Sequence, residues 1–269
     1  MRDSPLGPFT LGDVLSETIA VYRRNALGLL AIAAIVQVPL SMLTWLLFRT
    51  NEFPMEFPPQ EFPATSVWIR FIFKSLAASM LGGVAWNLMQ GALIHGISEQ
   101  TFRTPIQIDG TYYFSLKLFF PRLGALILSG MALLLMWITV LGIPFAIRYG
   151  GLWVFVLQTA SVEERGPRSA MSRSAELVRG NWSRVAGILF VAGILFGILG
   201  GIIGFLVGFI PVAGATIGTI ITAPFLIIAH TLLYFDLRTQ KDEAFNLEVL
   251  ASGLDRKSTR LNSSHVLIS

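Results

Sequence analysis

The sequence predicts an all-α fold, a polytopic membrane helical bundle of six transmembrane helices in three hairpins with short amphipathic interfacial helices. Hydrophobic residues make up 54% of the 269 residues and charged residues only 13%, whereas soluble domains carry about 25% charged residues. So little charge cannot cover a water-soluble surface, so we expect the excess apolar area to face lipid. Several apolar runs are also long enough to cross a bilayer as helices.

Six apolar segments approach the roughly 20 residues that a spanning helix needs. We expect spans at 27–48, within 67–97, and at 123–141, 145–162, 185–210 and 215–235. The two tightest turns, near residues 142 and 211, contain Gly and Pro, the strongest local helix breakers. The N-terminus lacks a short apolar core with a small-residue cleavage site, so we expect no signal peptide.

Lysine and arginine are distributed unevenly between the two sides of this topology, and this bias sets its orientation. The side with both termini holds Arg2, Arg23, Arg24, Arg103, Lys117, Arg122, Arg165, Arg168, Arg173, Arg179, Arg184, Arg238 and Lys241, and the other side holds Arg49, Arg70, Lys74 and Arg148. Thirteen against four predicts that both termini are cytoplasmic in a bacterial inner membrane. The external loop 49–66 is acidic and rich in proline, so we expect it to be extended.

A short amphipathic helix is expected before each hairpin. Thr10 and Asp13 form a capping-box pattern, Asp109 is a candidate cap for the second helix, and Pro167 suits the first turn of the third. In the third helix, an apolar face of Ala170, Met171, Ala175 and Val178 lies opposite Arg168, Arg173 and Glu176. Such helices are expected to lie at the membrane surface with their apolar faces in lipid.

The arginines of these entry segments are candidate contacts for anionic lipid head groups. They are Arg23, Arg24, Arg122, Arg173, Arg179 and Arg184. The alternative is that they only anchor the topology, as every multi-pass protein requires. The three units resemble an internal repeat of amphipathic helix, arginine, span, turn and span, and such repeats occur in transporters and in scaffolds alike.

Glycines recur at helical spacing in the fifth apolar segment. One series is Gly193, Gly197 and Gly201, and a second is Gly200, Gly204 and Gly208. Small residues four apart allow another backbone to approach closely. The pattern predicts packing within the bundle or a homodimer seam, and the alternative is a set of mobile helices around a substrate path.

Ionisable residues inside spans are scarce, and none forms a recognisable catalytic site. His95 and Glu99 are four residues apart and are expected to share an interfacial hydrogen bond, while His230 is expected to be a packing histidine. One His and one Glu are too few for a metal site. The chain has no cysteine, and the sequence contains no serine-nucleophile, phosphate-loop, zincin or dinucleotide motif. We therefore expect no enzyme activity, no cofactor and no nucleic-acid partner.

The C-terminal tail looks foreign to the rest of the chain. Residues 255–265 resemble a translated sequencing adapter, so we expect a single membrane domain over 1–254 and an artefactual or disordered tail over 255–269. Without the tail's three basic residues and one acid, the formal net charge changes from +4 to +2.

Three short motifs carry a family resemblance: residues 9–15 followed by Tyr22-Arg23-Arg24-Asn25, the helix end 173–182, and residues 231–238. Together they resemble bacterial polytopic proteins related to the membrane domain of glycerophosphoryl diester phosphodiesterases. The resemblance implies membrane placement, because catalysis in that family resides in a separate soluble barrel.

Three functions are consistent with these observations. The first is a non-catalytic membrane scaffold or accessory component of the bacterial envelope. The alternatives are a transporter or lipid-translocating protein, and the membrane domain of a phospholipid-metabolising phosphodiesterase that lacks its catalytic domain. The expected partners are the bilayer, with anionic lipids as candidates, and either a second copy of the chain or another membrane protein.

The topology predicts the outcome of reporter fusions. Alkaline phosphatase folds only outside the cytoplasm, so a fusion after residue 57 should be active and a fusion after residue 170 inactive. Enzyme activity in intact cells, normalised to fusion abundance, measures this. The reverse pattern would contradict the orientation.

Overall fold

The computed structural model describes residues 9–49, 65–101, 106–208 and 213–241, and no strand occurs among them. The helices are α1 (Leu11–Phe48), α2 (Thr65–Thr101), α3 (Ile108–Lys117), α4 (Phe119–Ile138), η1 (Val140–Gly142), α5 (Ile143–Leu152), α6 (Val156–Val162), α7 (Pro167–Val178), α8 (Trp182–Val207) and α9 (Ala213–Lys241). Within these ranges, six segments are long and apolar enough to span a membrane. The predicted all-α, multi-pass fold is confirmed; the external loop from residue 50 and the tail lie outside the described residues.

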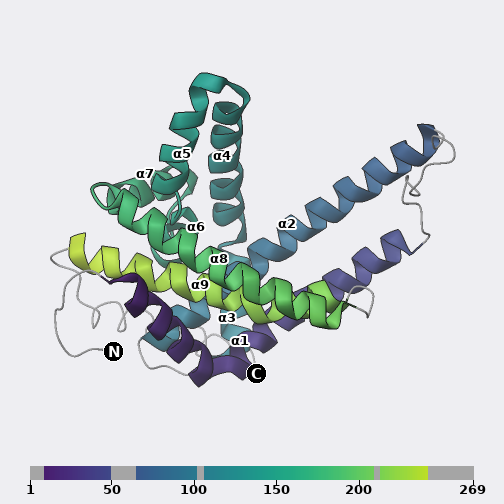
Figure 1. Cartoon of the computed structure of the whole chain (residues 1–269), viewed down its shortest axis with the longest axis horizontal. Helices are drawn as coiled ribbons and strands as arrows, with labels where there is room; N and C mark the ends of the chain where they lie inside the picture. The colour runs from purple at the N-terminus through teal and green to yellow at the C-terminus, as the bar shows by residue number, and fades with distance from the viewer. Residues whose placement is uncertain (1–8, 50–64, 102–105, 209–212, 242–269) are drawn as a thin grey trace, which may run out of the picture.

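Helix α9 lies at the centre of the assembly. It packs along α8 and α1 and also contacts α2, and half of its most apolar stretch is buried, against 22% or less in every other candidate span. In Figure 1, α8 and α9 run side by side along the long axis, the α4–α5 hairpin stands across them, and α2 extends away from the centre. Helix α9 therefore joins the first and third hairpins, while the second hairpin packs on α2 and α7.

The outer faces of the spans are apolar. More than half of the side-chain surface is exposed at large hydrophobic residues on three hairpins, including Met42, Phe73, Met80, Leu134, Leu135, Ile138, Leu141, Ile198, Phe205 and Leu206. Soluble monomers rarely expose continuous apolar patches of more than a few hundred Å². These faces are those of a protein whose solvent is lipid.

The first amphipathic helix is continuous with the first span. The capping box is confirmed, because the Asp13 N–H donates to Thr10 Oγ1 at 3.3 Å and the Thr10 N–H donates to Asp13 Oδ2 at 3.0 Å. A kink at Asn25, with φ −134° and ψ 18°, separates the two parts of α1. The Asn25 side chain donates to the Val21 carbonyl at 3.1 Å. The kink immediately follows the arginine pair Arg23 and Arg24.

The second amphipathic helix begins two residues earlier than predicted. Gln107 is the N-cap of α3 and makes no side-chain cap, whereas Asp109 lies in the first turn. The prediction that Asp109 caps this helix is therefore wrong, although its charge still suits the positive end of the helix dipole. Tyr113 and Leu116 are exposed on α3, as Phe120 is at the start of α4.

The third amphipathic helix, α7, does not rest its apolar face on lipid. Pro167 occupies its first turn as predicted. Ala170 and Val178 are fully buried, however, and the helix packs on α4, α5, α6 and α9. The expectation of a surface helix is wrong here because protein covers the apolar face, and Arg173 points inward with it.

The fourth span is broken into two helices. The turn at η1 is tight, since a Cβ atom at Gly142 would lie 2.1 Å from the Met136 carbonyl oxygen. The chain then turns again between Leu152 and Val156, which separates α5 from α6. Both helices pack against α4 and α7, but this second break gives each a further neighbour of its own: α5 also contacts α8, and α6 also contacts α2.

The two glycine series of α8 have different surroundings. Gly200 and Gly204 face α9. A Cβ atom added to Gly218 of α9 would lie 3.2 Å from the Gly200 carbonyl oxygen, and a Cβ atom added to Gly214 would lie 2.7 Å from the Gly204 carbonyl oxygen. Gly208 closes the same seam, with its Cα 2.8 Å from the Gly214 Cβ position. Gly193, Gly197 and Gly201 have nothing within 4 Å of their Cβ positions. The series through Gly200 therefore packs inside the bundle, and the series through Gly193 is open.

Substitution of glycine in these two series should have unequal effects. Gly214→Ala places a methyl group against backbone that cannot yield easily, so we expect it to lower the free energy of unfolding by about 1–3 kcal/mol. Gly197→Ala, the matched control on the open face, should be neutral or slightly stabilising. Thermal unfolding in detergent compares them, and equal effects would contradict the assigned seam.

Candidate functional site

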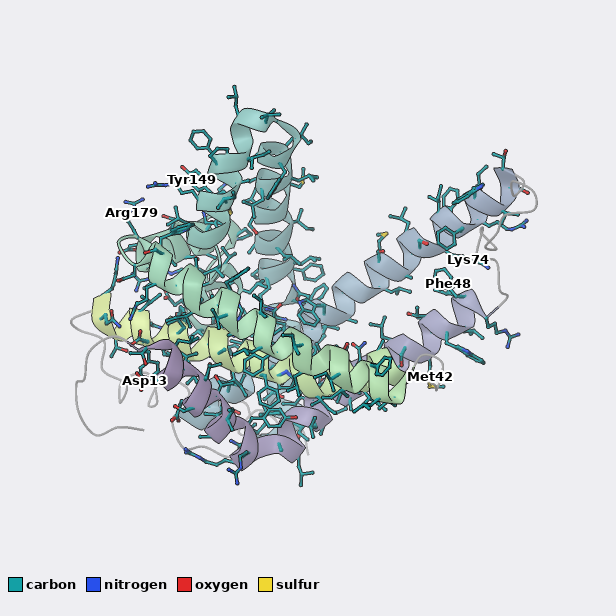
Figure 2. The ribbon with its side chains drawn as sticks, in the orientation of Figure 1. Asp13, Met42, Phe48, Lys74, Tyr149 and Arg179 are labelled. Atoms are coloured by element: carbon teal, nitrogen blue, oxygen red, sulfur yellow. The ribbon has the colours of Figure 1, made fainter. Side chains whose placement is uncertain are left out.

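A cavity of about 520 Å³ opens between α5, the end of α7 and the start of α8. We call it the basic pocket. It is lined by Pro144, Phe145, Ile147, Arg148, Tyr149, Leu152, Ala175, Arg179, Gly180 and Trp182. Figure 2 shows Tyr149 and Arg179 next to one another at this end of the molecule. The lining combines aliphatic side chains, three aromatic residues and two arginines.

Two glycines shape the basic pocket. Gly180 has φ +90°, a left-handed conformation that suits glycine and ends α7 after Arg179. Gly151 makes room for the indole of Trp182, whose Nε1 would lie 2.0 Å from a Cβ atom there. The indole N–H donates to the Arg148 carbonyl at 3.1 Å. This bond joins the start of α8 to α5 and fixes one wall of the pocket.

The charge of the basic pocket is uncompensated. Arg148 and Arg179 are exposed, and neither guanidinium pairs with a carboxylate in the part of the chain that the structure describes. Lys241 at the end of α9 adds a third cation, since its Nζ donates to the Glu176 and Arg179 carbonyls at 2.8 and 2.5 Å. Cations at the C-terminal end of a helix such as α7 are stabilised by its dipole. The guanidinium groups of Arg148 and Arg179 therefore give the pocket a positive charge, which the partial negative charge at the C-terminal end of α7 reduces but does not cancel.

The structure brings Arg148 next to Arg179. The sequence placed Arg148 on the external side and Arg179 on the cytoplasmic side, but both line the same pocket. The reason is the break between α5 and α6, which ends α5 beside the start of α8 rather than carrying it straight across.

Glu163 lies at the centre of an ionic cluster that holds α7 in place. Its side chain is only 7% exposed, and its carboxylate lies 2.5 Å from Arg165 Nε, 3.3 Å from Arg173 Nε and 4.0 Å from Arg238 Nε. The Tyr234 hydroxyl donates to it at 2.8 Å. The cluster ties the end of α6 and the middle of α7 to α9.

The pKa of Glu163 reflects this environment. Burial by itself raises the pKa, but the hydrogen bonds and the three arginine charges outweigh burial and hold the pKa below its ordinary value. Glu163 is therefore ionised at neutral pH, because the three neighbouring arginines stabilise the charged carboxylate.

The other predicted head-group arginines occupy contrasting places. Arg23 and Arg24 are exposed on α1, with Arg24 3.9 Å from Glu17. Arg184 pairs with Asp236 at 3.3 Å and so joins α8 to α9. Arg173 is buried in the Glu163 cluster, and Arg122 is 1% exposed inside the protein. Among the six, Arg23, Arg24 and Arg179 are exposed.

The weak polar candidates make local contacts. His95 Nδ1 lies 3.7 Å from Glu99 Oε1, which is an ion-pair separation longer than the hydrogen bond that we predicted. The His95 ring also lies against Phe114, with centroids 4.2 Å apart. His230 Nδ1 bonds the Leu226 carbonyl at 2.8 Å, as a packing histidine does. Within the described ranges, no group of three His, Asp or Glu side chains is arranged to hold a metal ion.

No known protein family, curated protein or solved structure matches this chain. The resemblance to the phosphodiesterase membrane domain therefore stays a prediction, and the geometry of the site is what indicates a function.

Sequence reasoning missed most of the basic pocket. Arg148 carried a usable signal, because an arginine within a span is by default a candidate functional residue. Tyr149 and Trp182 carried a weaker one, as aromatic residues enriched at membrane interfaces. No local pattern indicated that Glu163 collects three arginines, since two of them are distant in sequence.

Glu163→Gln should destabilise the protein strongly. The substitution leaves three arginines without their shared carboxylate, and removing one partner of a buried ion pair costs about 3 kcal/mol. Thermal or denaturant unfolding in detergent measures the change. The matched control is Glu176→Gln, which removes an exposed partner of Arg173 at 3.2 Å and should cost less than about 1 kcal/mol.

The same cluster predicts a pH dependence. A carboxyl whose pKa is lower in the folded state contributes stability above its unfolded pKa of about 4.3 and loses it as the pH falls through the folded value. The wild type should therefore lose stability below about pH 4.3, and Glu163→Gln should lose less over that range. Identical pH profiles for the two proteins would contradict this role of Glu163.

Proposed function

We propose that this chain is a non-catalytic component of the bacterial inner membrane that binds the head group of an anionic phospholipid in the basic pocket. The observation that carries the proposal is the pair of exposed guanidinium groups of Arg148 and Arg179 on one apolar cavity, neither of which pairs with a carboxylate among the described residues. Basic pockets between membrane helices on the cytoplasmic side suit lipid head groups.

The chemistry of the lining supports a lipid rather than a soluble anion. Pro144, Phe145 and Ile147 supply an apolar wall for an acyl chain. Tyr149 and Trp182 supply aromatic rings with a polar edge, which favour the depth of the head groups. Arginine binds phosphate in a planar, two-pronged geometry and is weakly hydrated, so it suits a site that is half in lipid.

A scaffold or accessory role follows from what surrounds the pocket. The Glu163 cluster and the Trp182 hydrogen bond fix α7 and α8 on their neighbours, so the bound lipid meets a rigid site. In the orientation predicted from the arginine bias, Arg179 and both termini lie on the cytoplasmic side, where anionic lipid gives the surface a negative potential. A bound head group there would fix the depth and tilt of the protein for a membrane partner.

The double variant Arg148→Gln/Arg179→Gln tests the proposal. Each cation near an anionic membrane surface contributes about 1 kcal/mol, so the affinity for phosphatidylglycerol should fall about 25-fold. Native mass spectrometry of the full chain, titrated with phosphatidylglycerol and with phosphatidylcholine, measures the affinities. Phosphatidylcholine binding should change little.

Arg168→Gln is the matched control. Arg168 is an exposed arginine on α7 that does not line the basic pocket, and it has the same formal charge. Its removal should leave the affinity for phosphatidylglycerol within about twofold of the wild type. An equal loss in the control, or no loss in the double variant, would contradict lipid binding in this pocket.

A further inference from the structure

A second cationic site lies inside the helical core, apart from the basic pocket. Arg122, in the first turn of α4, is 1% exposed. Its guanidinium lies directly on the backbone of α2, where a Cβ atom at Gly91 would be 1.8 Å from Nη1. Glycine at position 91 is therefore what admits this side chain between the helices.

The acceptors around Arg122 are all neutral and all bind one nitrogen. Nη2 donates to the carbonyl and Oδ1 of Asn87, both at 3.2 Å, and to the carbonyl and Oγ of Ser115, at 2.9 and 2.8 Å. Nε and Nη1 have no hydrogen-bond partner among the described residues. No carboxylate in the same ranges forms an ion pair with Arg122. The positive charge is therefore buried without a counter-ion.

The side-chain groups at this site that lack a hydrogen-bond partner among the described residues are donors. Asn87 Nδ2 is also buried without a partner, so two side chains that bond one another leave three donor nitrogens unsatisfied. A buried charge is strongly unfavourable unless it is paired. Water would accept hydrogen bonds from these nitrogens but would leave the charge unbalanced. A bound anion meets both needs.

We propose that Arg122 and Asn87 bind an oxyanion of the phosphate type, carried by a lipid head group or free in solution. Arginine and amide donors match the several acceptor oxygens of such a group. Exposed Tyr113 and Leu116 on α3 lie on the adjoining helix, so the site adjoins a surface facing the lipid interface. Access requires α3 to move about Leu118, the single residue between α3 and α4.

The experiment measures the unfolding temperature of the full chain in detergent, starting without phosphate or anionic lipid. Three additions are compared: sodium phosphate, sodium chloride at equal ionic strength, and phosphatidylglycerol against phosphatidylcholine in mixed micelles. At about 100 times the Kd, phosphate or phosphatidylglycerol should raise the wild-type unfolding temperature by about 5 °C. A response to phosphate indicates a free anion, and a response to phosphatidylglycerol alone indicates a head group.

Two variants locate the response at Arg122, and both are made in the Arg148→Gln/Arg179→Gln background so that a ligand bound in the basic pocket does not contribute. Arg122→Leu should abolish it. Asn87→Asp keeps the shape of the site and places a carboxylate about 3.2 Å from Nη2, so it should raise the starting unfolding temperature and abolish the response. Asn87→Asp keeps the test decisive if Arg122→Leu does not fold.

Two controls keep this site distinct from the basic pocket. Arg168→Gln and the double variant Arg148→Gln/Arg179→Gln should both retain the response, whatever the outcome for the proposed function. Four results would overturn the inference: no wild-type response to phosphate or phosphatidylglycerol, an equal response to chloride, a wild-type response in Asn87→Asp, or loss of the response in the Arg148→Gln/Arg179→Gln double variant.

Discussion

The carboxylate of Glu163 is the interaction on which the packing of α6, α7 and α9 depends. This single buried carboxylate forms ion pairs with Arg165, Arg173 and Arg238 and also accepts a hydrogen bond from the Tyr234 hydroxyl. In a low-dielectric interior such a cluster is strong when complete and costly when one member is missing. It holds α7 on α9, and α7 in turn carries Arg179 to the edge of the basic pocket.

The arginines of this chain have three different structural roles, although their sequence contexts look alike. Arg173 and Arg184 join helices through carboxylates. Arg148 and Arg179 face a cavity without a carboxylate partner in the described residues. Arg122 is buried against neutral acceptors. These roles differ in how deeply each arginine is buried and in whether a carboxylate lies beside it. Both matter because the net free energy of a buried cation depends on its desolvation and on its partner.

Lipid as the solvent explains why the helices pack as they do. Apolar burial gives little drive for association between spans, so close backbone contact and polar bonds must supply it. The seam between α8 and α9 uses glycines for close contact, and the ends of the same two helices use Arg184 with Asp236. The open series at Gly193, Gly197 and Gly201 shows that the same motif also occurs where no described helix covers it.

The sequence by itself determined the fold class, the number of spans, the capping box of α1 and the start of α7 at Pro167, because length, apolar content and cap chemistry are local properties. It did not determine that Asp109 is no cap, that Arg173 points inward, or that Arg148 lies beside Arg179. Those outcomes needed the tertiary structure, since each depends on which distant helix covers a face. The basic pocket and the Arg122 site are of this second kind: their residues come from helices that only folding brings together.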